Sequence, residues 1–272
     1  MNAAPKSAAP LAALFEPAGA GFMAAPATRG PWDERMMHGG APSALLAHAI
    51  EQTGPGAAEL VVARLTIEFL GGVPVGPVEV QTSLAKPGTR FQVVEATLDA
   101  GGRPACLARA VRLRRDDLPD AAAAPPDGSE PLPGPVAGER LPQFVESEGE
   151  LFYPDATEIR LVGGRLGSGH AIAWIRLRGE LLPGVAPSPL VRACAAADFA
   201  NGLSWILPFD EWLFVNTDLT VHLHREPVGE WIGLDARTTS DASGVGLASG
   251  VLHDERGRFG TCAQALFVQR RA

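Results

Sequence analysis

Apolar and polar residues alternate in short runs along both halves of the chain. The run VEVQTSLA at residues 78–85 is one example, and EWIGLDAR at residues 230–237 is another. Alternation of this kind, with many β-branched residues, predicts strands that bury one face. The segments DAGGR and DERGR resemble hairpin turns, so we expect consecutive strands to pair in an antiparallel sheet.

The strand pattern occurs twice, at an offset of 154 to 155 residues. LTIEF at residues 65–69 matches LTVHL at residues 219–223, and a short turn with a Pro-Val pair follows each of them. Related strands close the two halves, and in this alignment Gln264 of the second half matches Arg109 of the first. An offset held over five segments indicates an internal repeat.

One alanine-rich segment precedes the strands of each half. APSALLAHAIEQ at residues 41–52 and PSPLVRACAAADFAN at residues 187–201 have proline and serine at the start and glycine near the end, which predicts helices. Neither has a wide polar stripe, so we expect the sheet to surround them. An antiparallel sheet wrapped around a central helix is the hotdog arrangement. The predicted class is therefore α+β, a double hotdog with two sheets, each wrapped around its own helix.

A proline-rich stretch divides the two halves. Seven prolines fall between Pro119 and Pro142, where they disfavour both a regular helix and a central strand. We expect an N-terminal hotdog at residues 1–115, a connector at residues 116–150 and a C-terminal hotdog at residues 151–272. The two modules are expected to behave as one unit with a shared site.

Composition narrows the possible functions. With 46% apolar residues the chain has material for a core, and its net charge of −8 disfavours sequence-independent binding of nucleic acid. No apolar run reaches the ~18 residues of a membrane-spanning helix. Cys106, Cys194 and Cys262 are an odd number of cysteines without metal-type spacing, which fits free thiols in a reducing compartment. A soluble, cytoplasmic protein is expected.

Asp198 is the most informative single residue, because its neighbours in the predicted helix are Cys194, three alanines, Phe199 and Ala200. Burial of a carboxylate among such residues costs several kcal/mol unless partners or a task compensate for it. A polar bond to the helix end near Asn201 is one interpretation. The other is a general base, or a group that orients water, in a desolvated cleft.

Gln264 lies on the last predicted strand, on the same face as Cys262 and Leu266. That face is apolar, so the amide is expected to be buried and hydrogen-bonded. It could satisfy a backbone group in the core, or it could belong to a site with Asp198.

The strand VNTDLTVHLHR places Asn216 on its polar face and Thr217 on its apolar face if the alternation is strict. His222 and His224 share the polar face. A metal site would need a third ligand of suitable spacing, so we expect solvated histidines and no metal.

His38, Gly39 and Gly40 stand directly before the first predicted helix. Two glycines there would let a ligand approach bare amide groups at the positive end of the helix dipole, which suits an oxygen that gains negative charge. An ordinary loop is the alternative. His48, within the helix, is expected to be a packed residue and not a catalyst.

The chain resembles the thioesterase-like double-hotdog superfamily, which includes the acyl-CoA thioesterase II enzymes. TDLTVHLHREP at residues 217–227 and TCAQ at residues 261–264 are similar to two strands of that family, and the latter carries a catalytic glutamine. Asp198 matches the family's helix aspartate. The family has a serine or threonine where this chain has Asn216, with Thr217 next to it.

The His-Gly-Gly segment resembles the motif of the phenylacetyl-CoA type of hotdog thioesterase, in which an aspartate follows on the same helix. Here that aspartate is absent from the first half, while the second half has Asp198 and no glycine pair. The resemblance therefore implies one composite site. It would hydrolyse an acyl-CoA thioester: Asp198 orients and deprotonates a water held by Gln264 and by Asn216 or Thr217, and the Gly40 amide binds the thioester oxygen. No cofactor is implied.

Other functions stay open at this point. A non-catalytic protein that binds an acyl group or acyl-CoA would keep the fold, and a hotdog enoyl-CoA hydratase would share it, although the Asp-x-Asn-Pro-x-His signature of the latter is absent. A homodimer and a role in lipid metabolism are expected. Four basic residues could attract the anionic CoA or could be solvated charges at strand ends: Arg109, Arg112, Arg114 and Arg115.

Overall fold

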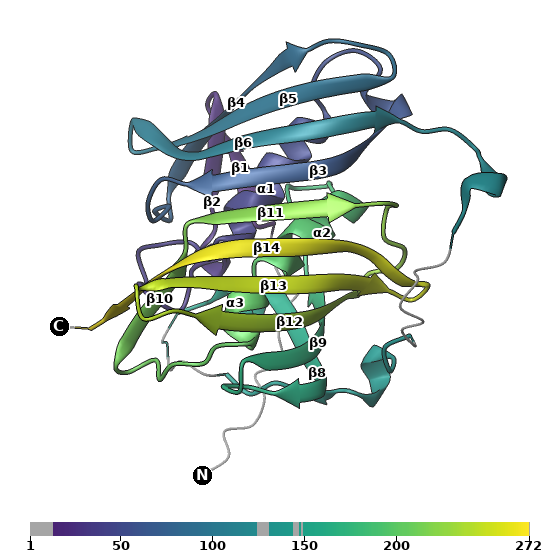
Figure 1. Cartoon of the computed structure of the whole chain (residues 1–272). Helices are drawn as coiled ribbons and strands as arrows, with labels where there is room; N and C mark the ends of the chain where they lie inside the picture. The colour runs from purple at the N-terminus through teal and green to yellow at the C-terminus, as the bar shows by residue number, and fades with distance from the viewer. Residues whose placement is uncertain (1–12, 124–130, 144–146, 148, 272) are drawn as a thin grey trace.

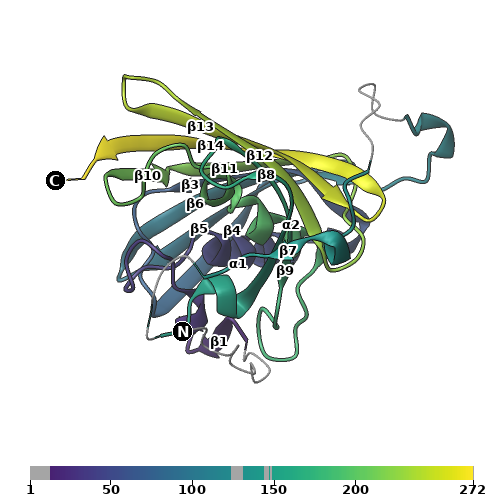
Figure 2. The same ribbon diagram turned by 90° about the horizontal axis from the view of Figure 1, so that it is seen from below.

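The computed structural model describes residues 13–123, 131–143, 147 and 149–271. Within these residues, the named strands form one antiparallel sheet that curves around the helices (Figures 1 and 2). The first half of the sheet contains, in spatial order, β1 (Phe15–Ala18), β2 (Gly21–Ala24), β4 (Pro77–Lys86), β5 (Phe91–Ala100), β6 (Arg103–Arg114) and β3 (Leu60–Phe69). The second half continues with β11 (Asp218–Leu223), β14 (Gly257–Arg270), β13 (Val245–Asp254), β12 (Ile232–Ser240), β9 (His170–Leu177), β8 (Thr157–Arg165) and β7 (Glu139–Arg140). A short strand, β10 (Trp212–Asn216), pairs separately with β14.

The two halves meet where β3 pairs with β11, so the described strands belong to one sheet of 14 strands. This corrects the expectation of two separate sheets. A strand at the edge of a sheet leaves its backbone N–H and C=O groups unpaired, and the contact between β3 and β11 pairs both edges.

This junction has an approximate twofold symmetry. Thr66 lies opposite Thr220, and the residues around them pair in the same way in both directions along the strands. The Thr220 hydroxyl donates to the Thr66 hydroxyl at 3.3 Å. Each strand therefore presents the same segment to the other, as two subunits of a symmetric dimer do, although here both belong to one chain.

The strand pairing corrects one match that was made from the sequence. The two central threonines face Arg109 in the first half and Ala263 in the second. Arg109 therefore corresponds to Ala263, and the counterpart of Gln264 is Ala110. The alignment was wrong by one residue, and in a strand a slip of one residue moves a side chain to the opposite face.

The first predicted helix is α1 (Gly40–Glu51), whereas the second is divided into α2 (Pro189–Ala197) and α3 (Ala200–Leu203). The division falls at Asp198, with φ −68° and ψ −15°, and at Phe199, with φ −75° and ψ −3°. These ψ values are far from those of an α-helix, so the chain turns more tightly here. Asp198 consequently lies at the end of a helix and not in its interior.

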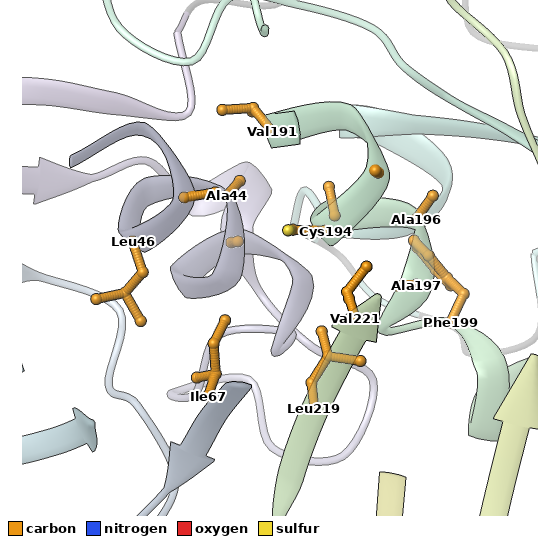
Figure 3. Packing of buried hydrophobic residues seen from close by; sticks show 14 of the residues in the cluster. Ala44, Leu46, Ile67, Val191, Cys194, Ala196, Ala197, Phe199, Leu219 and Val221 are labelled. Atoms are coloured by element: carbon orange, nitrogen blue, oxygen red, sulfur yellow. The ribbon is translucent and has the colours of Figure 1, made fainter. Parts of the chain in front are cut away.

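α1 and α2 pack against each other beneath the middle of the sheet, and they run in opposite directions. Ala44 of α1 and Cys194 of α2 are fully buried at this contact, with Leu219 and Val221 of β11 below them (Figure 3). Alanines on both helices let the two backbones approach closely. As a result, the N-terminus of each helix lies beside the C-terminus of the other, and this brings the candidate residues of the two halves together.

The described part of the proline-rich stretch is mostly exposed; it leaves the sheet after β6 and rejoins it at β7, the strand at the edge (Figure 1). Trp174 of β9 anchors it by donating its indole N–H to the Pro133 carbonyl at 2.6 Å. Five single-turn helical segments complete the description: η1 (Pro26–Thr28), η2 (Ala57–Glu59), η3 (Pro119–Ala121), η4 (Pro135–Ala137) and η5 (Phe152–Ala156). Among the described helices, none has both the length and the apolar character needed to cross a membrane.

Candidate active site

The Asp198 carboxylate lies in the gap between α2 and α3, and its side chain is only 3% exposed. Its Oδ1 accepts hydrogen bonds from Asn216 Nδ2 at 2.8 Å and from Gln264 Nε2 at 3.2 Å. Two side-chain amides therefore hold one oxygen of the buried carboxylate, and this is the compensation that its burial requires. The described contacts contain no bond from this carboxylate to Asn201.

Gln264 is fully buried, as the alternation of its strand led us to expect. Its Oε1 accepts from the backbone N–H of Asn201 at 3.1 Å, and its Nε2 donates to the Asp198 carbonyl and to the carboxylate, each at 3.2 Å. The two interpretations of this residue are thus compatible, because one amide satisfies backbone groups at the helix break and the carboxylate beside them. These partners also fix which end of the amide carries the oxygen, since the opposite orientation would set two oxygens against each other.

Asn216 and Thr217 lie on faces opposite to those that strict alternation predicts. Asn216 ends β10 and points to Asp198, whereas Thr217 is exposed, and its hydroxyl lies 3.4 Å from the Ala265 carbonyl. The prediction failed because Thr217 is a bend between β10 and β11, and the phase of the alternation changes there. Phe214 faces inward before the bend and Leu219 after it. The structure therefore places Asn216 beside Asp198 and Thr217 away from it.

Gly39 and Gly40 reach this position from the first half of the molecule. A Cβ on Gly39 would lie 2.8 Å from both carboxylate oxygens of Asp198. A Cβ on Gly40 would lie 2.8 Å from the Ala195 carbonyl and from a ring carbon of Phe152. Glycine is therefore required at both positions, because α2 and its neighbours approach so closely that no side chain would fit.

His38 contacts the other oxygen of Asp198. Its Nδ1 is 2.9 Å from Asp198 Oδ2, and its side chain is 13% exposed. The imidazole ring lies against Phe152, at a centroid distance of 4.9 Å, and against Phe199, at 4.4 Å, and the two phenylalanine rings stack on each other at 5.8 Å. Backbone pairing with Thr28 at 2.8 Å fixes the chain at this point. No sequence pattern pointed to the two phenylalanines that pack against the ring.

The cysteines near the site are not suited to nucleophilic chemistry. Burial, and next the charge of Asp198, raises the pKa of Cys106 to about 12 and that of Cys262 also to about 12. Burial is also the first cause of the raised pKa of Cys194. A thiol is a nucleophile only as the thiolate, so these groups stay protonated at neutral pH.

The remaining candidates lie outside this group of residues. Arg112 is buried and donates to the carbonyls of Ile50 and Thr53 at the end of α1, so it is no solvated strand-end charge. The other three arginines of that sequence cluster make ion pairs at the surface. His222 is exposed, and the described residues contain no group of three potential metal ligands. Burial is the largest cause of the lowered pKa of His48.

Two surface hollows, of about 160 and 420 Å³, occur elsewhere on the first half. The smaller lies beside the turn after β3, and the larger lies along β2, β4 and β5. Neither is lined by Asp198 or by any residue that contacts its carboxylate. The chemistry-bearing residues therefore gather at the contact between the two helices and not in these hollows.

Known protein families match both halves of the chain. Residues 28–113 match the acyl-CoA thioesterase N-terminal domain, and residues 115–268 match the acyl-CoA thioesterase C-terminal domain. No curated protein sequence matches the chain.

Several solved structures have a similar fold. A proposed thioesterase II from Thermobifida fusca YX is 18% identical with a TM-score of 0.69, and the match covers 93% of this chain and 94% of that one. The tesB protein of Mycobacterium avium subspecies paratuberculosis is 18% identical with a TM-score of 0.66, and the coverage is 94% and 96%. A conserved protein with a hot dog fold from Alicyclobacillus acidocaldarius is 18% identical with a TM-score of 0.66, and the coverage is 89% and 90%. At these identities the likeness concerns the hotdog fold.

Proposed function

Because the chain belongs to the acyl-CoA thioesterase family, we propose that it hydrolyses an acyl-CoA thioester to a free acid and CoA. The reaction would take place where the N-terminus of α1 meets the C-terminus of α2. One observation supports this location above all others: a buried carboxylate, Asp198, is held by amides of the second half, and Gly39 of the first half lies so close that a Cβ there would be 2.8 Å from both of its oxygens.

In the proposed reaction, Asp198 orients a water molecule and supplies the negative charge that draws a proton from it. Asn216 and Gln264 hold the carboxylate and position the water by hydrogen bonds. An amide at position 216 would take the place of the hydroxyl that the related enzymes have there. Thr217 has no part in the reaction, since its side chain is exposed on the other side of the bend.

The thioester oxygen would bind at the start of α1. Attack by water places negative charge on that oxygen, and backbone N–H groups at a helix N-terminus stabilise such charge. Gly40 is the donor that we propose. Its N–H donates to His38 Nδ1 at 3.0 Å and would have to turn from there to the thioester oxygen, while Gly39 leaves room for the carboxylate. Removal of one such donor typically costs about 10²–10³ in rate.

We also propose that the fold is a fused pair of hotdog modules. The N-terminal module would cover residues 1–115, the connector residues 116–150 and the C-terminal module residues 151–272. The twofold pairing of β3 with β11 supports this division, as does the boundary between the two matched family domains near residue 114.

A non-catalytic protein that binds acyl-CoA is the second candidate. One observation favours it: the Asp198 side chain is 3% exposed, and both of its oxygens already have protein partners. Such a carboxylate could be a structural part of a binding site.

Release of free thiol from a series of acyl-CoA esters separates these functions. We expect hydrolysis by the wild-type protein and a loss of about 10³-fold in kcat for Asp198→Ala, since proton transfer of this kind contributes about 10²–10⁴. Asp235→Ala is the matched control, because Asp235 also pairs with a histidine, His170, at 2.8 Å. Binding of acyl-CoA without hydrolysis would support the second candidate, and an Asp198→Ala variant with full activity would exclude the proposed site.

A further inference from the structure

The outer face of the sheet is open. The helices α1, α2 and α3 lie on the inner side of the described sheet, and no described helix covers the other side (Figures 1 and 2). A sheet face in contact with water normally carries polar side chains. Here, five of the ten large apolar side chains that are exposed in the described ranges lie on β6, β13 and β14: Leu107, Leu113, Val245, Leu247 and Phe267. Apolar residues gathered on one open face indicate a surface that another protein covers.

Acidic and basic residues are separated at the centre of this face. Across the β3–β11 junction, Glu68 lies opposite Asp218, and Arg64 lies opposite His222. Like charges directly opposite each other destabilise a sheet. Within the described ranges, no ion pair includes any of these four residues. One end of the junction is therefore acidic and the other basic, without a partner of opposite charge from the described part of the chain.

Each of these pairs belongs to a row of outward-facing residues that crosses the strands β6, β3, β11, β14 and β13 in that order. The line through Thr66 and Thr220 separates the two rows. The acidic row contains Leu107, Glu68, Asp218, Ala265 and Leu247. The basic row contains, on the same strands, Val111, Arg64, His222, Thr261 and Val251. All of these residues are exposed or half-buried, so their side chains are accessible to another molecule.

The two rows are complementary to each other strand by strand. On β3 and β11 an acidic residue of one row corresponds to a basic residue of the other, and on β6 and β13 an apolar residue corresponds to an apolar one. A second copy that faces this sheet and is related to it by a twofold axis along the line between the rows would set each acidic row against a basic row. A twofold axis along the strands would instead set Glu68 against Asp218, acid against acid. The distribution of charge therefore favours the first orientation.

We propose that the outer face of the sheet binds a second copy of this chain, in a dimer whose twofold axis runs along the line through Thr66 and Thr220. Glu68 pairs with Arg64 of the partner subunit. Leu107 and Leu247 pack against the partner's Val111 and the partner's Val251. Symmetry repeats each of these contacts, and the strands of the two sheets lie nearly aligned, as in other sheets that pack face to face.

An exchange of charges tests this dimer, with sedimentation velocity of the full chain at micromolar concentrations as the measurement. We expect the wild-type protein to be a dimer. Glu68→Arg sets two arginines against each other at both symmetric contacts and should raise Kd by about 100-fold or more. Adding Arg64→Glu to this variant restores opposite charges and should return Kd to within about tenfold of the wild-type value. Glu16→Arg is the matched control, since Glu16 is exposed on β1, and it should leave Kd unchanged.

These variants separate association from folding. Within one subunit, Glu68→Arg replaces two carboxylates that lie opposite each other with a pair of opposite charges, so the folded subunit should not lose stability. Thermal unfolding of the monomeric variant measures this. A wild-type protein that is a monomer at micromolar concentrations, a dimer whose Kd does not respond to Glu68→Arg, or a failure of the double exchange to restore association would each overturn the proposal.

Cross-linking of Ser249→Cys tests the orientation. Ser249 lies on the line between the rows, because it is paired with Ala263, which is itself paired with Thr220. In the proposed dimer it faces Ser249 of the partner subunit, whereas an axis along the strands would set it against the partner's Glu95. The three native cysteines are buried, so a short bis-maleimide should join the subunits of Ser249→Cys and not those of the wild type. A dimer that this reagent does not join would overturn the proposed orientation.

Discussion

The two ends of the α1–α2 pair have the same backbone plan but different chemistry. At one end, the start of α1 meets the end of α2, and the buried carboxylate of Asp198 is held by two amides and a histidine. At the other end, the start of α2 meets the end of α1. There the carboxylate of Glu51 accepts one hydrogen bond from the Ser188 hydroxyl at 2.6 Å.

Strand pairing identifies the residues of the first half that correspond to Gln264 and Asn216, whose side-chain amides hold Asp198. Ala110 is the counterpart of Gln264, and Val62 is the counterpart of Asn216. Both are buried apolar residues. The two ends thus share a backbone arrangement, while only one of them has the side chains that a buried carboxylate needs.

The electrostatics of Glu51 illustrate this difference. Burial raises its pKa to about 6, and the Ser188 hydroxyl offsets only part of that effect. Nearby, the guanidinium of Arg112 donates to the carbonyl of Ile50 in the last turn of α1 and to that of Thr53 just after it. The second end therefore has a structural role. Polar groups satisfy the carbonyls at the end of the helix, and burial of the Glu51 carboxylate disfavours its ionised form.

The strongest test of the comparison is Gly39→Ala. The added Cβ would lie 2.8 Å from both oxygens of Asp198, so the carboxylate must move. A shift of about 1 Å in a reacting group can cost about 100-fold, and we expect a loss of that size in kcat for acyl-CoA hydrolysis. Gly71→Ala is the control, because nothing lies within 4 Å of its Cβ position. Equal activity of the two variants would mean that the glycine end is not the reactive one.

The next effect is expected at the other end, for Arg112→Met. The change leaves the carbonyls of Ile50 and Thr53 without their buried donor, and we expect the free energy of unfolding to fall by about 3 kcal/mol. Urea unfolding measures this, with Arg109→Met as an exposed control expected to change by less than about 1 kcal/mol. The kcat of the folded variant should not change. A loss of kcat without a loss of stability would show that both ends take part in the reaction.

The smallest effect is expected for Glu51→Gln, and it depends on pH. The pKa of Glu51 is about 6 in the folded protein, above its ordinary value of 4.5, so its ionisation opposes folding once the pH exceeds 4.5. Glutamine stays neutral and can still accept the Ser188 hydroxyl. We expect the variant to be more stable than wild type by about 1–2 kcal/mol at pH 8, and by much less at pH 4.5.

Thermal or urea unfolding at several pH values measures this difference, with the exposed Glu16→Gln as the control. The gain should appear as the pH rises from 4.5 through 6. The same gain at every pH, or none at pH 8, would contradict the account of Glu51 as a poorly satisfied carboxylate.

Much of the fold could be predicted because its signals are local. Alternation predicted the strands, and the Pro-Ser starts and glycine ends predicted the helices. The site was partly predictable for the same reason: Asp198 stands out in an alanine-rich helix, and Gln264 stands out on an apolar strand face. Each is a polar residue in a position whose neighbours predict burial.

The errors arose where the structure departs from the regular pattern that a local rule assumes. Thr217 was assigned to the wrong face because a bend interrupts the alternation between β10 and β11. Arg109 was matched to Gln264 because similar strands can be aligned with an error of one residue, and only their pairing with β3 and β11 fixes the register. Arg112 was expected at the surface, since the sequence does not reveal that the end of α1 lies beside it.

The sequence by itself determined the repeated plan of strands around a helix and the small set of polar residues to be buried within it. Hydrophobic periodicity and helix-end chemistry act over a few residues, so they can be read without knowing the rest of the chain. Only the tertiary structure decided that His38 and Gly39 would meet Asp198, because that contact requires β3 to pair with β11 and two helices to pack in opposite directions. Such pairings depend on strand edges and helix faces far apart in the chain, and no local pattern records which of them will come together.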